Sequence, residues 1–228
     1  HGSEEVLLMA QAPAVSAGHG RAAGPRSAAL RWLLHPAAKP LLHGLCLLPL
    51  AWLVYAAAFD HLGANPAEAL IRSLGGWTLR LLCLTLAVTP LRQMLGLPAL
   101  ARFRRMLGVY TFCYALLHLL CYSVFDMGLD WGEIARDVAK RPFILVGMCA
   151  FALLLLLAAT SFNRAIRWLG ARRWQQLHRS VYLIAGLALL HFFWMRAGKN
   201  DFAEVAVYAA IVAVLLLARI GRKLLLKK

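Results

Sequence analysis

The chain has 228 residues, of which 61% are hydrophobic, and its mean hydropathy of +0.66 excludes an ordinary soluble enzyme and predicts an integral membrane protein. The formal net charge is +15. Because the basic residues lie between apolar runs, we attribute this charge to membrane topology and expect no nucleic-acid partner.

Ala, Gly, Ser and Pro dominate the beginning of the chain. Such a composition buries little apolar surface. We therefore expect residues 1–34 to be a leader that is either flexible or added to the native sequence. The remainder, 35–225, is expected to form a single transmembrane domain.

Six apolar runs follow the leader, and each is close to the roughly 17–25 residues that a membrane-spanning helix requires. The second is the shortest and is expected to end at Thr89-Pro90, and the connections are too short for a further domain. The chain is therefore predicted to be an all-α integral membrane protein, a bundle of six transmembrane helices. The runs lie at about 41–59, 76–91, 106–125, 143–160, 178–195 and 203–220.

Lys and Arg residues are shared unequally between the two ends of this bundle. With the N-terminus taken as cytoplasmic, 18 of the 25 fall on the cytoplasmic side and 6 on the opposite side, while Arg80 lies inside the second span. Positive charge marks the cytoplasmic loops of membrane proteins. Both termini are therefore predicted to be cytoplasmic.

Three histidines lie within the predicted spans: His118 on the third, and His178 and His191 on the fifth. Ionisable side chains at membrane depth are costly and mark functional sites. The third and fifth spans run in the same direction, and the rise per residue brings His118 and His191 to a similar depth, towards the outer side. Imidazole pairs on facing helices hold haem iron. The sequence therefore predicts that His118 and His191 are the axial ligands of one b-type haem.

His178, near the inner edge of the fifth span, has no histidine opposite it. At that depth the third span offers Arg104 and Arg105, whose guanidinium groups suit propionates or phosphates. The inner site is expected to hold either a second haem, with His178 as a single or weak ligand, or a flavin mononucleotide (FMN). The residues leave both open. Arg80 either snorkels to the interface or pairs with a propionate of the outer haem.

One geometric difficulty concerns the two histidines of the fifth span. A step of 13 residues is not a whole number of helical turns, so His178 and His191 do not share one face of an ideal helix. A tilt, side-chain reach or a local π-bulge could bring them onto one face. We therefore assign them to separate sites.

Several motifs resemble those of a known family. Over about residues 35–225 the chain is similar to the haem-binding membrane subunit of the bacterial periplasmic protein-methionine-sulfoxide reductase system, which belongs to the ferric-reductase-like transmembrane superfamily. The run from Trp174 to Tyr182 is the most specific of the motifs. The motifs are Leu62-Gly63-Ala64-Asn65-Pro66, Thr89-Pro90-Leu91, Arg104-Arg105-Met106-Leu107-Gly108, Leu117-His118-Leu119, Arg141-Pro142-Phe143, Trp174-Gln175-Gln176-Leu177-His178-Arg179-Ser180-Val181-Tyr182 and His191-Phe192-Phe193-Trp194.

The resemblance implies an electron path across the bacterial inner membrane. A cytosolic flavin or flavin reductase, directly or through bound FMN, or else quinol, would donate electrons. Haem b would carry them to a periplasmic molybdopterin-containing catalytic subunit that reduces methionine sulfoxide. It also implies that His118 and His191 bind the haem and that His178, Arg104 and Arg105 form the inner site. Two-haem members of the superfamily carry two histidines on the third span, whereas this chain has Arg104 in place of the lower one.

Two other classes of function fit the sequence less well. A self-contained ferric or quinone reductase of cytochrome b type often carries a nucleotide-binding domain, and none is expected after Lys228. A small transporter usually shows internal repeats and broken helices with midplane charges, and the sequence shows no clear repeat. The spans hold no nucleophile or acid–base pair, so we expect an electron-transfer subunit without an organic substrate site of its own.

Overall fold

The computed structural model describes residues 25–198 and 200–225, and within these ranges every regular element is helical. Six helical segments are long and apolar enough to cross a membrane, which confirms the predicted fold class. A 3₁₀ turn (Pro98–Leu100) precedes α5, and a π-helical turn (Tyr122–Asp126) follows it. The helices are α2 (Pro25–Leu34), α3 (Ala38–Ala58), α4 (Pro66–Leu95), α5 (Ala101–Cys121), α6 (Trp131–Lys140), α7 (Pro142–Ala159), α8 (Asn163–Leu169), α9 (Ala171–His178), α10 (Val181–Ala197) and α11 (Ala203–Leu225).

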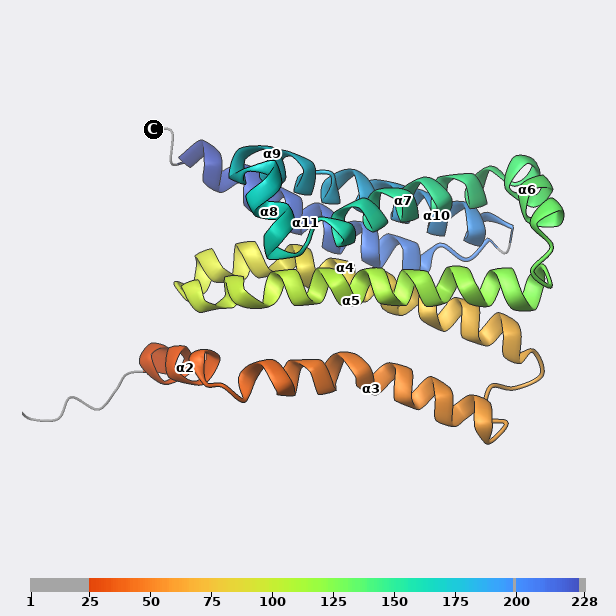
Figure 1. Ribbon diagram of the computed structural model, residues 1–228, viewed down its shortest axis with the longest axis horizontal. Coiled ribbons are helices and arrows are strands. Elements are labelled where there is room, and N and C mark those ends of the chain that lie inside the picture. The colour runs from red at the N-terminus through yellow and green to blue at the C-terminus, as the bar shows by residue number, and fades with distance from the viewer. Residues whose placement is uncertain (1–24, 199, 226–228) are drawn as a thin grey trace, which may run out of the picture.

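The membrane-spanning helices run along one direction, with α4 and α5 in the middle of the bundle (Figure 1). Helix α3 flanks them on one side, and α7, α10 and α11 lie on the other. The short helices α8 and α9 lie at one end and α6 lies at the opposite end. Helix α2 and the C-terminal end of α11 share the end of α8 and α9, as an even number of spans requires.

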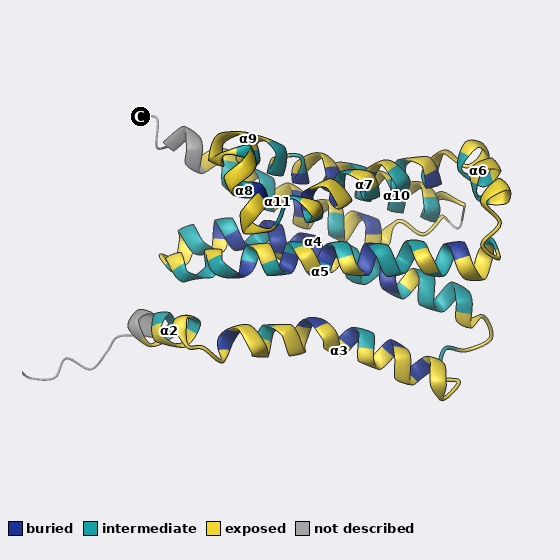
Figure 2. Cartoon of the chain, in the orientation of Figure 1, coloured by how far each residue is buried: buried dark blue, intermediate teal, exposed yellow. Residues whose placement is uncertain are grey.

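Two apolar cores share α4. One core, with Leu82, Leu86 and Ile184 fully buried, lies where α4, α5, α7, α10 and α11 meet. The other, around Leu74 and Tyr114, joins α3, α4 and α5. Many large apolar side chains of the spans are exposed, and Figure 2 shows exposed residues along much of α3. An apolar exterior is what a bilayer requires of helices that satisfy their own backbone groups.

Helix α4 is longer than the sequence predicted. It begins at Pro66 and not near residue 76, because Asn65 caps it by accepting the amide of Glu68, and because Arg72 forms an ion pair with Glu68 one turn apart. These polar residues lowered the hydropathy of the first turns, although a long helix accommodates them.

The prediction that Thr89-Pro90 ends this span is also wrong, because α4 continues to Leu95. A proline inside a helix leaves the carbonyl four residues earlier without its amide partner. Here the Leu86 carbonyl accepts Nη2 of Arg219 from α11, at 3.3 Å. The helix ends instead at Gly96, which adopts a left-handed φ of 67°.

The fifth span is two helices, not one. Helix α9 ends at His178 and α10 begins at Val181, with the amides of Arg179 and Ser180 bonded three residues back to the carbonyls of Gln176 and Leu177. His178 and His191 therefore lie on separate helices. The relative orientation of the two histidines is set by this break between α9 and α10, and the described residues between them contain no π-helical turn. The π-helical turn lies at the end of α5.

Candidate functional site

His118 projects from α5 towards α4. Its Nδ1 lies 2.8 Å from the Ile71 carbonyl oxygen of α4. A carbonyl only accepts hydrogen bonds, so Nδ1 carries the proton and Nε2 keeps a free lone pair. The ring is thereby fixed in the tautomer that binds a metal through Nε2.

His191 is held in the same way by a different helix. Its Nδ1 lies 2.7 Å from the Phe143 carbonyl oxygen of α7. The Phe143 ring lies 6.0 Å from the imidazole ring, measured between centroids. Nδ1 again donates, so His191 presents the same free nitrogen as His118.

The two rings, which we call the histidine pair, face each other across the bundle. Their centroids are 6.3 Å apart and their planes are inclined at 80°. Imidazole nitrogens bind first-row metals at about 2.0–2.1 Å, so two rings on opposite sides of one iron have centroids roughly 6 Å apart. Neither Nε2 has a hydrogen-bond partner among the described residues. The histidine pair therefore fits the axial ligation of a haem.

His178 lies away from this pair. Its Nε2 is 3.1 Å from the hydroxyl of Thr160 at the end of α7, and the Trp174 ring stacks on its imidazole at 4.0 Å between centroids. Trp174 also donates its indole N–H to the Thr160 carbonyl at 2.8 Å. These contacts dock α9 against the end of α7, and they involve neither ring of the histidine pair.

The two predicted arginines differ in their surroundings. Arg105 is exposed and donates to Asn163 Oδ1 of α8 at 2.7 Å. Arg104 is half-buried, and it lies within electrostatic range of His178, Arg92 and Arg219. The end of the bundle that holds α8 and α9 therefore gathers basic groups around His178.

Arg219 was not predicted to be a site residue, because in the sequence it is only one of many cytoplasmic Lys and Arg residues. One of its Nη atoms donates to the Tyr182 hydroxyl and the other to the Leu86 carbonyl, and its buried Nε has no partner among the described residues. The acidic residues of the described chain lie elsewhere, on the connections and helix ends towards α6: Asp60, Glu68, Asp126, Asp130, Glu133, Asp137, Asp201 and Glu204. Among the residues that the structure describes, no carboxylate is thus available to neutralise the basic end.

Comparison with known proteins decides the family. The family model described as ferric reductase like transmembrane component matches residues 74–189. A relative from Polaromonas naphthalenivorans, named protein-methionine-sulfoxide reductase heme-binding subunit MsrQ, is 70% identical over 82% of this chain and 85% of its own length. The chain belongs to the MsrQ family.

More distant MsrQ proteins cover the same region. The relatives of that name from Ralstonia nicotianae and Caulobacter vibrioides are 56% and 44% identical, over 77% and 78% of this chain and 81% and 85% of their own lengths. The resemblance inferred from the motifs is thereby confirmed. The matched family region contains His118 and His178 and ends two residues before His191.

Arg80 is the remaining predicted site residue of this MsrQ-family chain. It is exposed on α4, and its guanidinium carbon lies 4.8 Å from the centroid of the Trp77 ring. It has no acidic partner among the described residues. This position agrees with either of the two interpretations of Arg80, as an interface cation or as a partner for a propionate.

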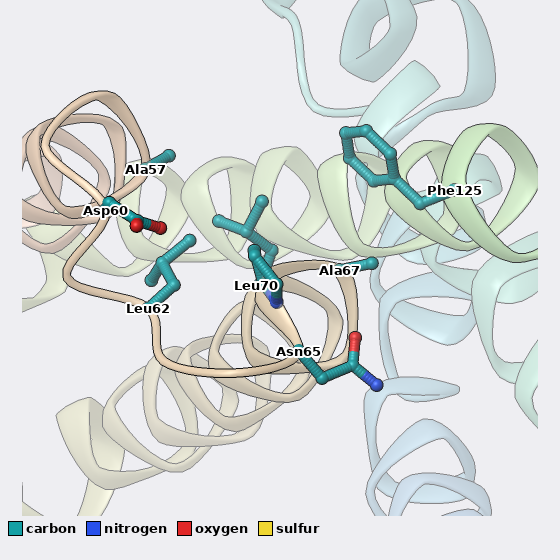
Figure 3. Close-up of a pocket in the computed structure, with 8 residues that line it drawn as sticks. Ala57, Asp60, Leu62, Asn65, Ala67, Leu70 and Phe125 are labelled. Atoms are coloured by element: carbon teal, nitrogen blue, oxygen red, sulfur yellow. The ribbon is translucent and has the colours of Figure 1, made fainter.

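An apolar hollow of about 350 Å³ lies beside the start of α4 (Figure 3). Asp60 and Asn65 supply its polar edge, while Leu62, Leu70 and Phe125 are drawn around its interior. None of the predicted site residues lines it. This hollow is therefore not part of the site described above.

Proposed function

We propose that this chain is the b-type haem membrane subunit of a protein-methionine-sulfoxide reductase system in the bacterial inner membrane. In this proposal it takes electrons from a cytosolic flavin or flavin reductase, or from quinol, and passes them to a periplasmic molybdopterin-containing catalytic subunit. The observation that carries the proposal is the histidine pair, two imidazoles with centroids 6.3 Å apart and both Nδ1 atoms bonded to carbonyls. The names of the relatives support the haem and the reductase system. The description of the family model and the six long apolar helices support the membrane.

The chain's own residues would hold the cofactor and exclude water. His118 and His191 would bind the iron, and the carbonyls of Ile71 and Phe143 would orient them, since hydrogen bonds to the outer nitrogen of a ligating histidine fix its ring. A bound haem supplies one-electron redox chemistry. The apolar side chains packed around α4, α5, α7 and α10 would keep that chemistry from solvent.

The inner site would hold an anionic cofactor near the electron donor. His178, Arg104 and Arg105 are assigned to it, and the candidates are a second haem and FMN. The concentration of basic groups at this end, with no carboxylate among the described residues there, supports an anionic ligand. The proposed topology places this end, and both termini, in the cytoplasm, where the flavin donor would dock.

Removal of either histidine of the pair is the decisive experiment. His118→Ala and His191→Ala should each remove the same b-type haem signal, because one iron needs both rings for a six-coordinate low-spin state. Haem per polypeptide is measured by pyridine haemochrome and reduced-minus-oxidised spectra of the purified chain. His43→Ala is the matched control, since His43 is exposed and bonds Tyr110.

Two outcomes would contradict the proposal. Wild-type haem content in both histidine variants would exclude the histidine pair as ligands, and a colourless wild-type protein after haem supplementation would favour a transporter. Flavin analysis of the same preparations, with His178→Ala beside wild type, separates FMN from a second haem at the inner site. Reduction of a purified periplasmic catalytic subunit, with reduced flavin or quinol as donor, tests the partner and the donor.

A further inference from the structure

Two glycines lie directly against the rings of the histidine pair. A Cβ placed on Gly75 of α4 would come within 3.2 Å of Nδ1 and Cε1 of His118. A Cβ on Gly147 of α7 would come within 2.9 Å of Nδ1 and 3.0 Å of Cε1 of His191. Favourable carbon contacts lie at about 3.5–4.0 Å, so a side chain at either position would have to push the ring away.

The two glycines occupy the same register relative to the carbonyls that hold the rings. Gly75 follows Ile71 by four residues, and Gly147 follows Phe143 by four residues. In an α-helix a carbonyl and the amide four residues later close one turn. Every Cα–Cβ bond tilts towards the helix N-terminus, so a side chain at the later position would flank the carbonyl. Glycine leaves that flank open, and the second lone pair of the oxygen can accept an imidazole N–H.

The same arrangement occurs on two helices with different local sequences. Ile-Arg-Ser-Leu-Gly on α4 faces α5, and Phe-Ile-Leu-Val-Gly on α7 faces α10. Each histidine is thus held by the helix that packs against its own, through a carbonyl and a glycine one turn apart. Among the described residues, no other helical glycine has an imidazole ring within 4 Å of an added Cβ, and Gly44, Gly186 and Gly221 have nothing within that distance.

We propose that Gly75 and Gly147 are positioning residues for the histidine pair, because their missing side chains let each imidazole donate Nδ1–H to the carbonyl one turn earlier and so fix Nε2 as the iron-binding nitrogen. This inference rests on the proposed function, namely that the histidine pair binds a haem. It adds two residues that touch no iron and that act only through the rings. The signature expected of them is a change in ligand strength and ring orientation, not merely in folding.

Alanine substitutions separate this role from a structural one. Alanine is a better helix former than glycine, so Gly→Ala in a helix interior should stabilise the backbone. A loss must then come from contact with the ring. Loss of an outer hydrogen bond to a metal-binding histidine typically weakens binding about 10–100-fold, and we expect this for Gly147→Ala. The effect of Gly75→Ala should be smaller, because its closest contact of 3.2 Å needs less displacement.

The experiment uses the full chain, purified in detergent with its haem. Haem affinity is measured by titration of haem-depleted protein, the midpoint potential by redox titration, and ring orientation by the g-values of the low-spin ferric haem in electron paramagnetic resonance. Gly75→Ala and Gly147→Ala should raise the midpoint potential, because an imidazole without its Nδ1 hydrogen bond is a weaker donor to ferric iron. They should also shift the g-values. Gly186→Ala, on the same helix as His191 but in open space, should match wild type in all three measurements.

Two results would overturn the inference. One is wild-type affinity, potential and g-values in both glycine variants while His118→Ala and His191→Ala lose the haem. The other concerns a Gly147→Ala chain that does not fold. Recovery of the helical, monodisperse protein when His191→Ala is added would support a collision with the ring, and persistent misfolding would overturn it. Haem retention in both histidine variants would instead refute the proposed function itself, so the two failures are distinguishable.

Discussion

At the scale of single residues, polar side chains in this molecule satisfy backbone groups that the helices leave open. Tyr114 is the clearest case outside the site. Its fully buried hydroxyl donates to the Cys46 carbonyl at 2.7 Å and accepts the Leu50 amide at 3.1 Å. These two groups are four residues apart on α3, so the hydroxyl is inserted into a helical hydrogen bond beside Pro49. Tyr114 therefore ties α3 to α5 and so to the rest of the bundle.

Tyr114→Phe tests this tie. We expect a destabilisation of about 1–2 kcal/mol, because hydrogen bonds between helices in membranes contribute about 0.6–1.7 kcal/mol and the two backbone groups lose their shared partner. Unfolding free energy in mixed detergent micelles is the measurement. Tyr110→Phe is the control, since among the described residues its hydroxyl bonds only the exposed His43, and its loss should have a smaller effect. Equal effects of the two substitutions would contradict the assigned role.

At the scale of elements, α4 is the central helix, since it contributes to both cores and its Ile71 carbonyl accepts the hydrogen bond of His118. Its passage through Pro90 depends on Arg219, which donates to the orphaned Leu86 carbonyl. Pro90→Ala restores the missing amide, so the helix can then bond that carbonyl itself. Arg219→Met should therefore destabilise the wild type more than it destabilises a Pro90→Ala chain, with a coupling of about 0.5–3 kcal/mol in a double-mutant cycle. Strictly additive unfolding free energies would mean that the two residues act independently.

The elements also show what the sequence could and could not predict. Hydropathy located all six spans, because lipid-facing helices must be apolar along their whole length. It missed the first ten residues of α4, where Arg72 and Glu68 neutralise each other, and the break after His178, where neither Gly nor Pro marks the end of a helix. The roles of Gly75 and Gly147 could not be predicted from the sequence, because they depend on which helices pack together. In the structure α4 packs against α5, and α7 packs against α10.

The depth of the site residues along the spans was easier to predict from the sequence than their rotation about the helix axes. The level of a residue along a span follows from the rise per residue and the charged edge of the helix, and the structure brings His118 and His191 together. Rotation about the helix axis is different, because it depends on packing that hydropathy does not encode. Arg219 shows this, since from the sequence it was one of many cytoplasmic charges and in the structure it reaches α4 and Tyr182 of α10. The ligand role of the histidine pair stays a prediction until haem content is measured.

At the scale of the whole molecule, charge divides the bundle into two unlike ends. The end with α8 and α9 is basic, while the acidic side chains of the described residues gather towards α6. Arg136 pairs with Glu133 and Arg141 with Asp137 there, so part of the basic charge at that end is neutralised locally. An unbalanced basic end next to the proposed inner site would attract an anionic flavin from the cytoplasm and retain that end on the cytoplasmic side during insertion.

The orientation can be read directly by cysteine labelling in a chain whose five native cysteines are replaced. Lys140, at the end of α6, and Arg167, on α8, are both exposed and lie at opposite ends of the bundle. In spheroplasts a membrane-impermeant maleimide should label Lys140→Cys at once and Arg167→Cys only after the membrane is permeabilised, because the basic end is retained inside. The haem spectrum of each variant checks that the fold is intact. Labelling of Arg167→Cys from outside would reverse the topology, and with it the direction in which electrons leave the histidine pair.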